Sequence, residues 1–255
     1  MQALITAGGS LKPNSALFLE TGIAKKGLIP IAGKTMVQWV VDAIIGSSRI
    51  EGLIVVGLQE GDVDPGGKPI RYLEDQGNLV DNVLAGVKVA QQVTPDSYKI
   101  FLSSSDVPLI TTEIVDEFID ICLGNEGEVH YTVIEEKTME ARFPHSERTF
   151  TRIKDGRFAG GDLMMLDTRA VNANIDMFRG ATGNRKNFLG IARRLGFTFI
   201  IRFLLGQLDL VEGEQRACKA FNVKGRILNY PRAEIAMDVD KLHHLELVRQ
   251  ELEAR

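Results

Sequence analysis

Short apolar runs rich in β-branched residues alternate with helix-length amphipathic segments through the first half of this chain. Such alternation is typical of stacked βαβ units, and it predicts a mainly parallel sheet covered by helices. The hydrophobic periodicity predicts strands at residues 4–6, 53–56, 70–73 and 100–102, and helices at residues 35–45, 79–89 and from 111 or 112 to 122.

The pattern changes after Gly127. Apolar runs at residues 129–134, 149–153 and 163–166 follow one another with no helix-length segment between them, which predicts antiparallel strands added to the parallel sheet. The chain then reads as helical from 168 to about 225, with closing strands at 224–228 and 234–237 and a last helix at 241–252. Because no linker or internal repeat divides the chain, we expect one α/β domain, residues 1–255, with a helical insertion at 168–226.

Composition excludes several classes of protein. The formal charge is −4 and 44% of the 255 residues are apolar, which disfavours both disorder and generalised nucleic-acid binding. Cys122 and Cys218 have no Cys or His at metal-ligand spacing, so no zinc site is encoded. The start of the chain lacks the pattern of a signal peptide, and the longest apolar run, 197–205, is far shorter than the ~20 residues of a membrane span. We therefore expect a cytoplasmic protein without a transmembrane segment.

A glycine pair directly follows the first expected strand, as Ala7-Gly8-Gly9. Glycines let a backbone approach a ligand closely, and α/β sheets bind ligands at the carboxyl ends of their parallel strands. The loop could therefore bind phosphate or a base edge through its N–H groups. From these residues alone, a simple strand-to-loop turn fits equally well.

Charged residues occupy three further segments next to short apolar runs. Lys26 lies in a Gly- and Pro-punctuated segment, residues 25–34, where an ammonium could neutralise phosphate charge. Asp106 follows an expected buried strand and precedes Val107-Pro108, a position suited to a Mg²⁺ ligand or to a turn cap. Asp238 and Asp240 end a short apolar run, and strand alternation would place both on one face.

Taken together and in this order, these features resemble the MobA-like NTP transferases, the nucleotidyltransferases of the molybdenum-cofactor guanylyltransferase and sugar-phosphate type. The family's start, in which A-G-G follows a short apolar run, matches residues 4–9, its lysine before L-x-P-x-x-G-K matches 26–34, and its aspartate before Pro-Leu matches 106–109. A late D-x-D before a helix matches 238–240. The resemblance implies a Rossmann-like, glycosyltransferase-A-like fold and transfer of an NMP from an NTP to a small phosphorylated or hydroxylated acceptor, with release of pyrophosphate.

The resemblance also implies a role for each matching residue. Lys26 and Asp106 would be catalytic, and Asp106 with Asp240 would hold Mg²⁺ or Mn²⁺. The nucleotide would be bound by Ala7, Gly8, Gly9, Lys26, Gly77 and Asn78. The acceptor would be bound by Gly160, Gly161 and Asp162.

One departure from the family leaves alternatives open. The family's arginine after the glycine loop is absent, and either Lys12 or Lys25 replaces it or the activity is weakened. A nucleotide-binding regulatory protein on the same fold therefore stays an alternative. So does a sugar-nucleotide glycosyltransferase, although its D-x-D motif is expected in mid-chain.

Two further segments are interpreted more plainly. His243 and His244 point in different directions on a helix, which favours helix surface over a metal site. Residues 176–202 carry one acid against six basic residues, a local net charge of +5, which could bind an anionic substrate, an acidic membrane surface or RNA. Because no aromatic-rich recognition motif accompanies it, a solvated helix face is the leading interpretation. The apolar run at 197–205 is expected to be core, with a dimer or weak membrane-surface contact through 179–205 as the sharper alternative.

Overall fold

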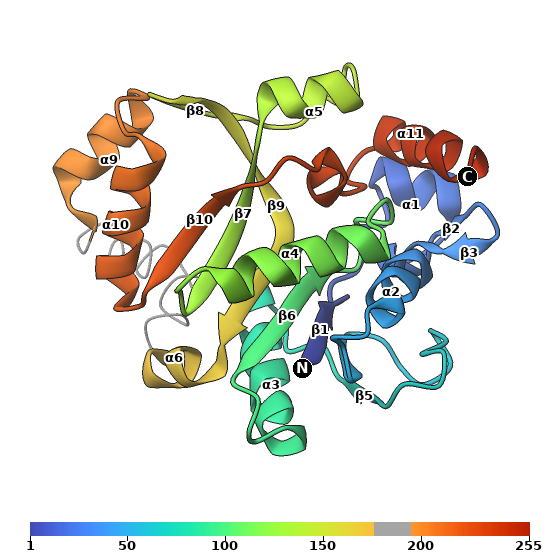
Figure 1. Ribbon diagram of the computed structural model, residues 1–255. Helices are drawn as coiled ribbons and strands as arrows, with labels where there is room; N and C mark the ends of the chain where they lie inside the picture. The colour runs from blue at the N-terminus through green and yellow to red at the C-terminus, as the bar shows by residue number, and fades with distance from the viewer. Residues whose placement is uncertain (176–194) are drawn as a thin grey trace.

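The computed structural model describes residues 1–175 and 195–255. Within them, eight strands form one mixed sheet, which lies at the centre of the molecule (Figure 1). The strands, in spatial order, are β10 (Gly225–Asn229), β7 (Val129–Glu135), β9 (Gly156–Asp167), β6 (Lys99–Ser104), β1 (Gln2–Thr6), β4 (Gly52–Val56) and β5 (Ile70–Leu73), with β8 (Thr151–Ile153) paired to β9 alone. A separate hairpin joins β2 (Pro30–Ile31) to β3 (Lys34–Thr35).

Strand direction divides the sheet into two parts. Strands β6, β1, β4 and β5 are parallel, as the βαβ pattern predicts. Strand β9 runs antiparallel to both β6 and β7, and β10 is parallel to β7. The predicted α/β fold with added antiparallel strands is therefore confirmed.

Helices cover both faces of the sheet. The described helices are α1 (Ala16–Thr21), α2 (Met36–Gly46), α3 (Leu79–Val93), α4 (Thr112–Gly124), α5 (Glu136–Arg142), α6 (Thr168–Ala173), α9 (Phe197–Leu204), α10 (Leu210–Phe221) and α11 (Leu242–Glu253), with 3₁₀ turns η1 (Lys26–Leu28) and η2 (Ala233–Ala236). Helices α2, α4 and α11 contribute to one buried cluster, and α3 and α6 contribute to a smaller one that contains the opposite face of β1 and β4. No described helix is long and apolar enough to cross a bilayer.

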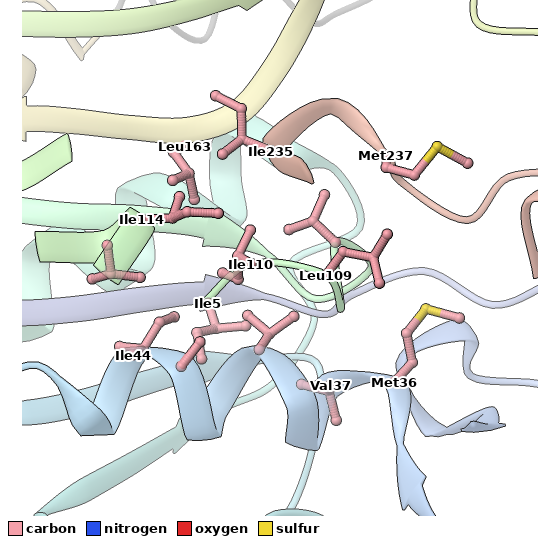
Figure 2. Packing of buried hydrophobic residues seen from close by; sticks show 14 of the residues in the cluster. Ile5, Met36, Val37, Ile44, Leu109, Ile110, Ile114, Leu163, Ile235 and Met237 are labelled. Atoms are coloured by element: carbon pink, nitrogen blue, oxygen red, sulfur yellow. The ribbon is translucent and has the colours of Figure 1, made fainter. Parts of the chain in front are cut away.

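The larger core lies directly beneath the loops that leave β6 and η2. Figure 2 shows Leu109 and Ile110 packed between α2 and the segment that carries Ile235 and Met237. Ile110 and Met237 are 2% and 0% exposed. Because these anchors are close in sequence to Asp106 and Asp238, the core fixes where both aspartates emerge.

Three expectations about the second half are wrong. Residues 234–237 form no strand, because the sheet ends at β10 and the chain turns through Pro231 into η2. Helix α5 lies between β7 and β8, where none was expected, because its polar sequence buries only Met139 and shows no helical periodicity. The apolar run at 197–205 is not simply core, since Leu204 and Leu205 are 77% and 62% exposed.

The expected helical block is found in part. Helices α6, α9 and α10 connect β9 to β10, while residues 176–194, with most of the basic segment, lie outside the described residues. Arg202 is described, and it pairs with Glu212 across α9 and α10. The division into one domain with an insertion, and the contact through 179–205, stay predictions.

Candidate active site

Three parallel strands end side by side at one edge of the sheet. Thr6, the last residue of β1, is in register with Val56 of β4 and Ser104 of β6. The loops that follow are tied to neighbouring strands, since Ala7 N–H donates to Val56 O (2.8 Å) and Ser105 N–H donates to Thr6 O (3.1 Å). Every predicted nucleotide and metal loop of the first half of the chain therefore leaves this edge or lies beside it.

The glycine loop requires glycine for steric reasons. Gly57 has φ +97°, and a Cβ there would lie 2.5 Å from the Gly8 backbone. A Cβ on Gly8 would lie 2.5 Å from Asn82 Nδ2 and from Asp75 Oδ1. The two main chains therefore approach each other closely, while Gly8 and Gly9 are exposed on the outer side of the loop, where a ligand could approach.

Asp75 joins the glycine loop to the start of α3. Its carboxylate accepts hydrogen bonds from Gly9 N–H (2.9 Å), Gly77 N–H (3.0 Å) and Asn82 Nδ2 (2.9 Å). The Asn82 amide and the two backbone donors lower the pKa of Asp75. The predicted segments 7–9 and 77–78 are thus brought together, through two residues, Asp75 and Asn82, that the sequence interpretation did not include.

The Asn78 side chain has a local structural task. Its Oδ1 accepts from Asp81 N–H (3.0 Å) and caps α3. The N-terminus of this 15-residue helix therefore faces the glycine loop, with the positive end of its dipole at the place predicted to bind nucleotide.

Lys26 lies at the centre of the acidic site. Its ammonium donates to Asp106 Oδ2 (2.5 Å) and to Asp240 Oδ1, so residues 26, 106 and 240 meet as predicted. Burial by itself lowers the pKa of Lys26, but the two carboxylates outweigh it and raise the pKa. The ammonium is therefore charged throughout the physiological range.

Four carboxylates gather around this ammonium. Single oxygens of Asp106, Asp238 and Asp240 lie within 4.8 Å of one another. Asp162 is close enough that burial, Asp106 and Asp238 together raise its pKa. Among the described residues, Lys26 and one further cation pair with these acids, so acids outnumber bases in the cluster.

That further cation is Arg148, which the sequence interpretation missed. Its guanidinium pairs with the Asp238 carboxylate, and Nη1 donates to Asp238 O (3.3 Å). Burial raises the pKa of Asp238 to about 6 in spite of this partner. Arg148 precedes β8 in an irregular loop, so nothing in the local pattern pointed to it.

The late D-x-D is held by main-chain contacts rather than by a strand. Val239 N–H donates to Asp106 O (3.0 Å), and Asp240 N–H donates to His244 Nδ1 (3.3 Å). The carboxylates of residues 238 and 240 still converge, although the strand alternation expected to align them is absent.

The prediction of helix surface for both histidines is wrong for His244. It is 1% exposed, and its Nε2 lies 2.9 Å from Ser146 O. Its Nδ1 accepts from Asp240 N–H and its Nε2 donates to Ser146 O, so the neutral ring carries its proton on Nε2. Burial, together with the charge of His243, lowers the pKa of His244 to about 4. His244 is therefore a positioning residue for Asp240.

The predicted acceptor segment, residues 160–162, lies on β9 beside β6. Asp162 follows Gly161 into the acidic cluster. A Cβ on Gly161 would overlap Thr132 Oγ1 and lie 2.9 Å from Ile235 Cδ1, and one on Gly160 would overlap Tyr131 Oη. Packing therefore explains both glycines, and only Asp162 presents a functional group at this edge.

The two candidates for the missing arginine are placed differently. Lys25 Nζ donates to Gly57 O (2.8 Å), directly beneath the glycine loop. The Lys12 side chain is exposed. Of the two lysines, Lys25 is therefore the one whose ammonium is held next to the glycine loop.

The acidic cluster fits a divalent cation. Carboxylate oxygens are the ligands that Mg²⁺ and Mn²⁺ prefer. Asp106 Oδ1 is buried and accepts no hydrogen bond from any residue within 1–175 and 195–255, so one ligand oxygen is available. Asp106 and Asp240, with Asp238 beside them, would hold the ion.

A glycine loop, a lysine and an aspartate cluster at the carboxyl edge of a parallel sheet are typical of a nucleotide-binding α/β protein. Residues 3–185 match the sequence model of the MobA-like NTP transferase domain, and the chain belongs to this family of nucleotidyltransferases.

Similarity to individual proteins supports the same assignment. The chain is 28% identical over 134 residues to the bifunctional protein GlmU of Thermoanaerobacter pseudethanolicus, which is 48% of this chain but only 28% of that relative's length. The structure of a hypothetical transferase from Thermus thermophilus superposes with a TM-score of 0.81 at 30% identity, over 96% of this chain and 100% of that one. The 4-diphosphocytidyl-2C-methyl-D-erythritol synthase of Anaerococcus prevotii, at 12% identity and TM-score 0.58 over 99% and 97% of the chains, shares the fold.

Proposed function

We propose that this protein is a Mg²⁺-dependent nucleotidyltransferase that transfers an NMP unit from an NTP to a small phosphorylated or hydroxylated acceptor. The observation that carries the proposal is the convergence of Lys26, Asp106 and Asp240 beside the glycine loop. In this reaction an acceptor oxygen attacks the α-phosphorus, the bond from the α-phosphorus to the bridging oxygen breaks, and pyrophosphate leaves.

The chain's own groups can supply most of what this reaction needs. The loop around Gly8 and the N-terminus of α3 bind and orient the nucleotide through main-chain N–H groups. The Lys26 ammonium stabilises negative charge on the phosphoryl oxygens as the bond to the leaving group lengthens. A cation held by Asp106 and Asp240 would screen the triphosphate and polarise the reacting phosphoryl group.

Neither a nucleophilic side chain nor a covalent intermediate is needed. The acceptor supplies the attacking oxygen, and its proton, if it has one, needs a base. Asp162 and Asp238 are candidates for that base because burial and the neighbouring carboxylates raise the pKa of Asp162, and burial raises the pKa of Asp238 to about 6. The same site would then bind the metal on one side and face the acceptor on the other.

The test is pyrophosphate release from each of the four NTPs against a panel of sugar phosphates, alcohols and cofactor precursors, with Mg²⁺ and with Mn²⁺. We expect one pair to react and Asp106→Asn to abolish the reaction. Lys34→Met, which removes an ammonium paired with Asp42 outside the site, is the control that should keep full activity.

Other outcomes would favour the alternatives. If NTP binds with Mg²⁺ and Asp106→Asn abolishes this binding, yet no acceptor reacts, the protein is a nucleotide-binding regulator on this fold. If sugar nucleotides are hydrolysed without pyrophosphate chemistry, it is a glycosyltransferase.

A further inference from the structure

A large apolar cavity lies beside the candidate active site, between the strands β7 to β9 and the helices α9 and α10. Its volume is about 500 Å³. The described side chains that line it are almost all apolar and include Val133, Phe158, Phe199, Ile200 and Phe203. Figure 1 shows α9 and α10 standing together at the β10 end of the sheet.

The cavity is too large to be a packing defect. Protein interiors are packed at the density of organic crystals, and voids larger than a water molecule are few. Pockets that bind small molecules measure roughly 300–1,000 Å³ and are lined mainly by apolar side chains with a few polar groups. The size and lining of this cavity therefore fit a ligand.

The cavity adjoins the acidic cluster through one strand. Gly160 lines it, and Asp162, two residues along β9, has its carboxyl group beside Asp106. The pairing of β9 with β7 shifts register in this stretch, and two residues along a strand span at most about 7 Å, so the two positions are close neighbours. The Tyr131 hydroxyl lies over Gly160, and burial together with the charge of Asp162 raises its pKa, which also places it between the cavity and the cluster.

The polarity of the cavity restricts its occupant. Among the described residues that line it, Asp209 is the charged one, and its carboxylate already caps α10 by accepting from Glu212 N–H (2.8 Å). A charged group inside would find no free counter-charge on these described residues and would lose its hydration. The occupant must therefore be apolar within the cavity, while any charged end lies outside it, toward Lys26 and Arg148.

We propose that this cavity binds the apolar part of the acceptor, so that the acceptor is an amphipathic molecule with a phosphate or hydroxyl head and a hydrocarbon body. The inference rests on the proposed function, because the head is the group that receives the NMP. The head reaches the cluster past Tyr131 and Asp162 while the body fills the space under α9 and α10.

The first test is direct binding, measured by calorimetry without nucleotide. The probes are hexyl, octyl and decyl phosphate, used below their micellar concentrations, with inorganic phosphate as the reference. Affinity should rise about 4-fold per added methylene until the cavity is filled, since each buried methylene contributes a similar increment. An affinity that does not depend on chain length would overturn the proposal.

A matched pair of variants locates the binding. Gly213 on α10 lines the cavity, and a Cβ built on it has no neighbour within 4 Å. Gly213→Phe should therefore fill the cavity without a clash and weaken decyl phosphate binding at least 10-fold. Gly124, at the end of α4, is equally open but does not line the cavity, so Gly124→Phe should bind like the unmodified protein.

A third variant separates the cavity from the adjacent surface. Val211 on the same helix is 63% exposed and does not line the cavity. If Val211→Glu abolishes binding while Gly213→Phe does not, the chains adsorb to the outer apolar surface, as a membrane contact would, and the proposal is wrong. Should Gly213→Phe fail to fold, Gly213→Leu and the chain-length series still decide the question.

Failure of this inference can be told apart from failure of the proposed function. Pyrophosphate release with hydrophilic acceptors alone, unchanged in Gly213→Phe, would overturn the apolar acceptor and leave nucleotidyl transfer intact. Chain-length-dependent binding that Gly213→Phe abolishes, with no NTP turned over, would leave the cavity as a ligand site and overturn its role for an acceptor.

Discussion

Removing the Lys26 charge should tighten cation binding to the free protein while it slows the reaction. The ammonium pairs with Asp106 and Asp240, the two carboxylates proposed as metal ligands. A cation that enters the nucleotide-free site must therefore displace it. Lys26→Met keeps most of the apolar stem of the side chain and removes this competitor.

The size of the effect follows from the exposure of the two pairs. The side chains of Lys26 and Asp106 are 20% and 18% exposed, so this hydrogen bond to a charged group contributes about 1.5–3 kcal/mol. Asp240 is 59% exposed, and its pair contributes about 0.2–1 kcal/mol. A cost of about 2–3 kcal/mol removed from cation binding lowers the Kd roughly 30- to 160-fold.

The assay is titration with Mn²⁺ followed by electron paramagnetic resonance, in the absence of nucleotide. Lys34→Met removes a comparable surface pair, with Asp42, and should leave the Kd unchanged. In the presence of NTP and acceptor, kcat of Lys26→Met should fall about 10²- to 10³-fold, as when one donor to a transition-state charge is removed. An unchanged or weaker Mn²⁺ affinity in Lys26→Met would refute the competition between ammonium and cation.

Three further predictions concern stability. Gly57→Ala should lower the free energy of unfolding in urea by at least about 2 kcal/mol and weaken NTP binding, because its Cβ would strike the Gly8 backbone. At the control position Gly33, φ is +82° and a Cβ would have no neighbour within 4 Å. Gly33→Ala should therefore cost only about 1 kcal/mol and leave NTP affinity unchanged. The pKa of His244 is lowered from 6.5 in the unfolded chain to about 4 in the folded protein, so between these pH values the unfolded chain binds the extra proton. The free energy of unfolding should therefore decrease by up to about 3 kcal/mol as the pH is lowered from 6.5 to 4. A urea-stability profile of His244→Gln over this pH range should lack this loss. Tyr230→Phe should lower the free energy of unfolding by about 1 kcal/mol, since the buried hydroxyl donates to a main-chain carbonyl, and equal stability would show that this bond contributes nothing.

The parts of the site that the sequence predicts are those that follow a periodic element. Lys26, Asp106 and Asp240 each adjoin a short apolar segment, and loops at the carboxyl ends of neighbouring parallel strands meet. Asp106 closely follows strand β6, whereas Lys26 and Asp240 were grouped with it by the resemblance to the family, whose motifs occur in the same order. The lack of a strand at residues 234–237 did not matter, because the Val239–Asp106 main-chain bond sets the D-x-D instead.

Other residues left no comparable signal. Asp75 and Arg148 lie in irregular segments, and each contacts a partner far away in the sequence. Asp75 binds Gly9, 66 residues before it, and Arg148 binds Asp238, 90 residues after it. His244 is different, because the buried residues His244, Val248 and Leu252 recur every four positions along α11. That spacing is typical of the buried face of a helix, so the sequence alone could have predicted that His244 is buried and that His243 lies off this face.

The balance of charge in the cluster argues for a ligand rather than for a structural ion-pair network. A structural network would match acids to bases, since an unpaired buried charge is costly. Here Asp106, Asp162, Asp238 and Asp240 face two cations, and Asp106 Oδ1 has no donor among the described residues. The close-packed core beneath, with Leu109 and Met237 fully buried, holds these loops in place against their repulsion. The carboxylates of Asp106, Asp238 and Asp240 therefore offer the oxygen ligands of a divalent cation, and they lie close to Asp162, which is two residues along β9 from the apolar cavity.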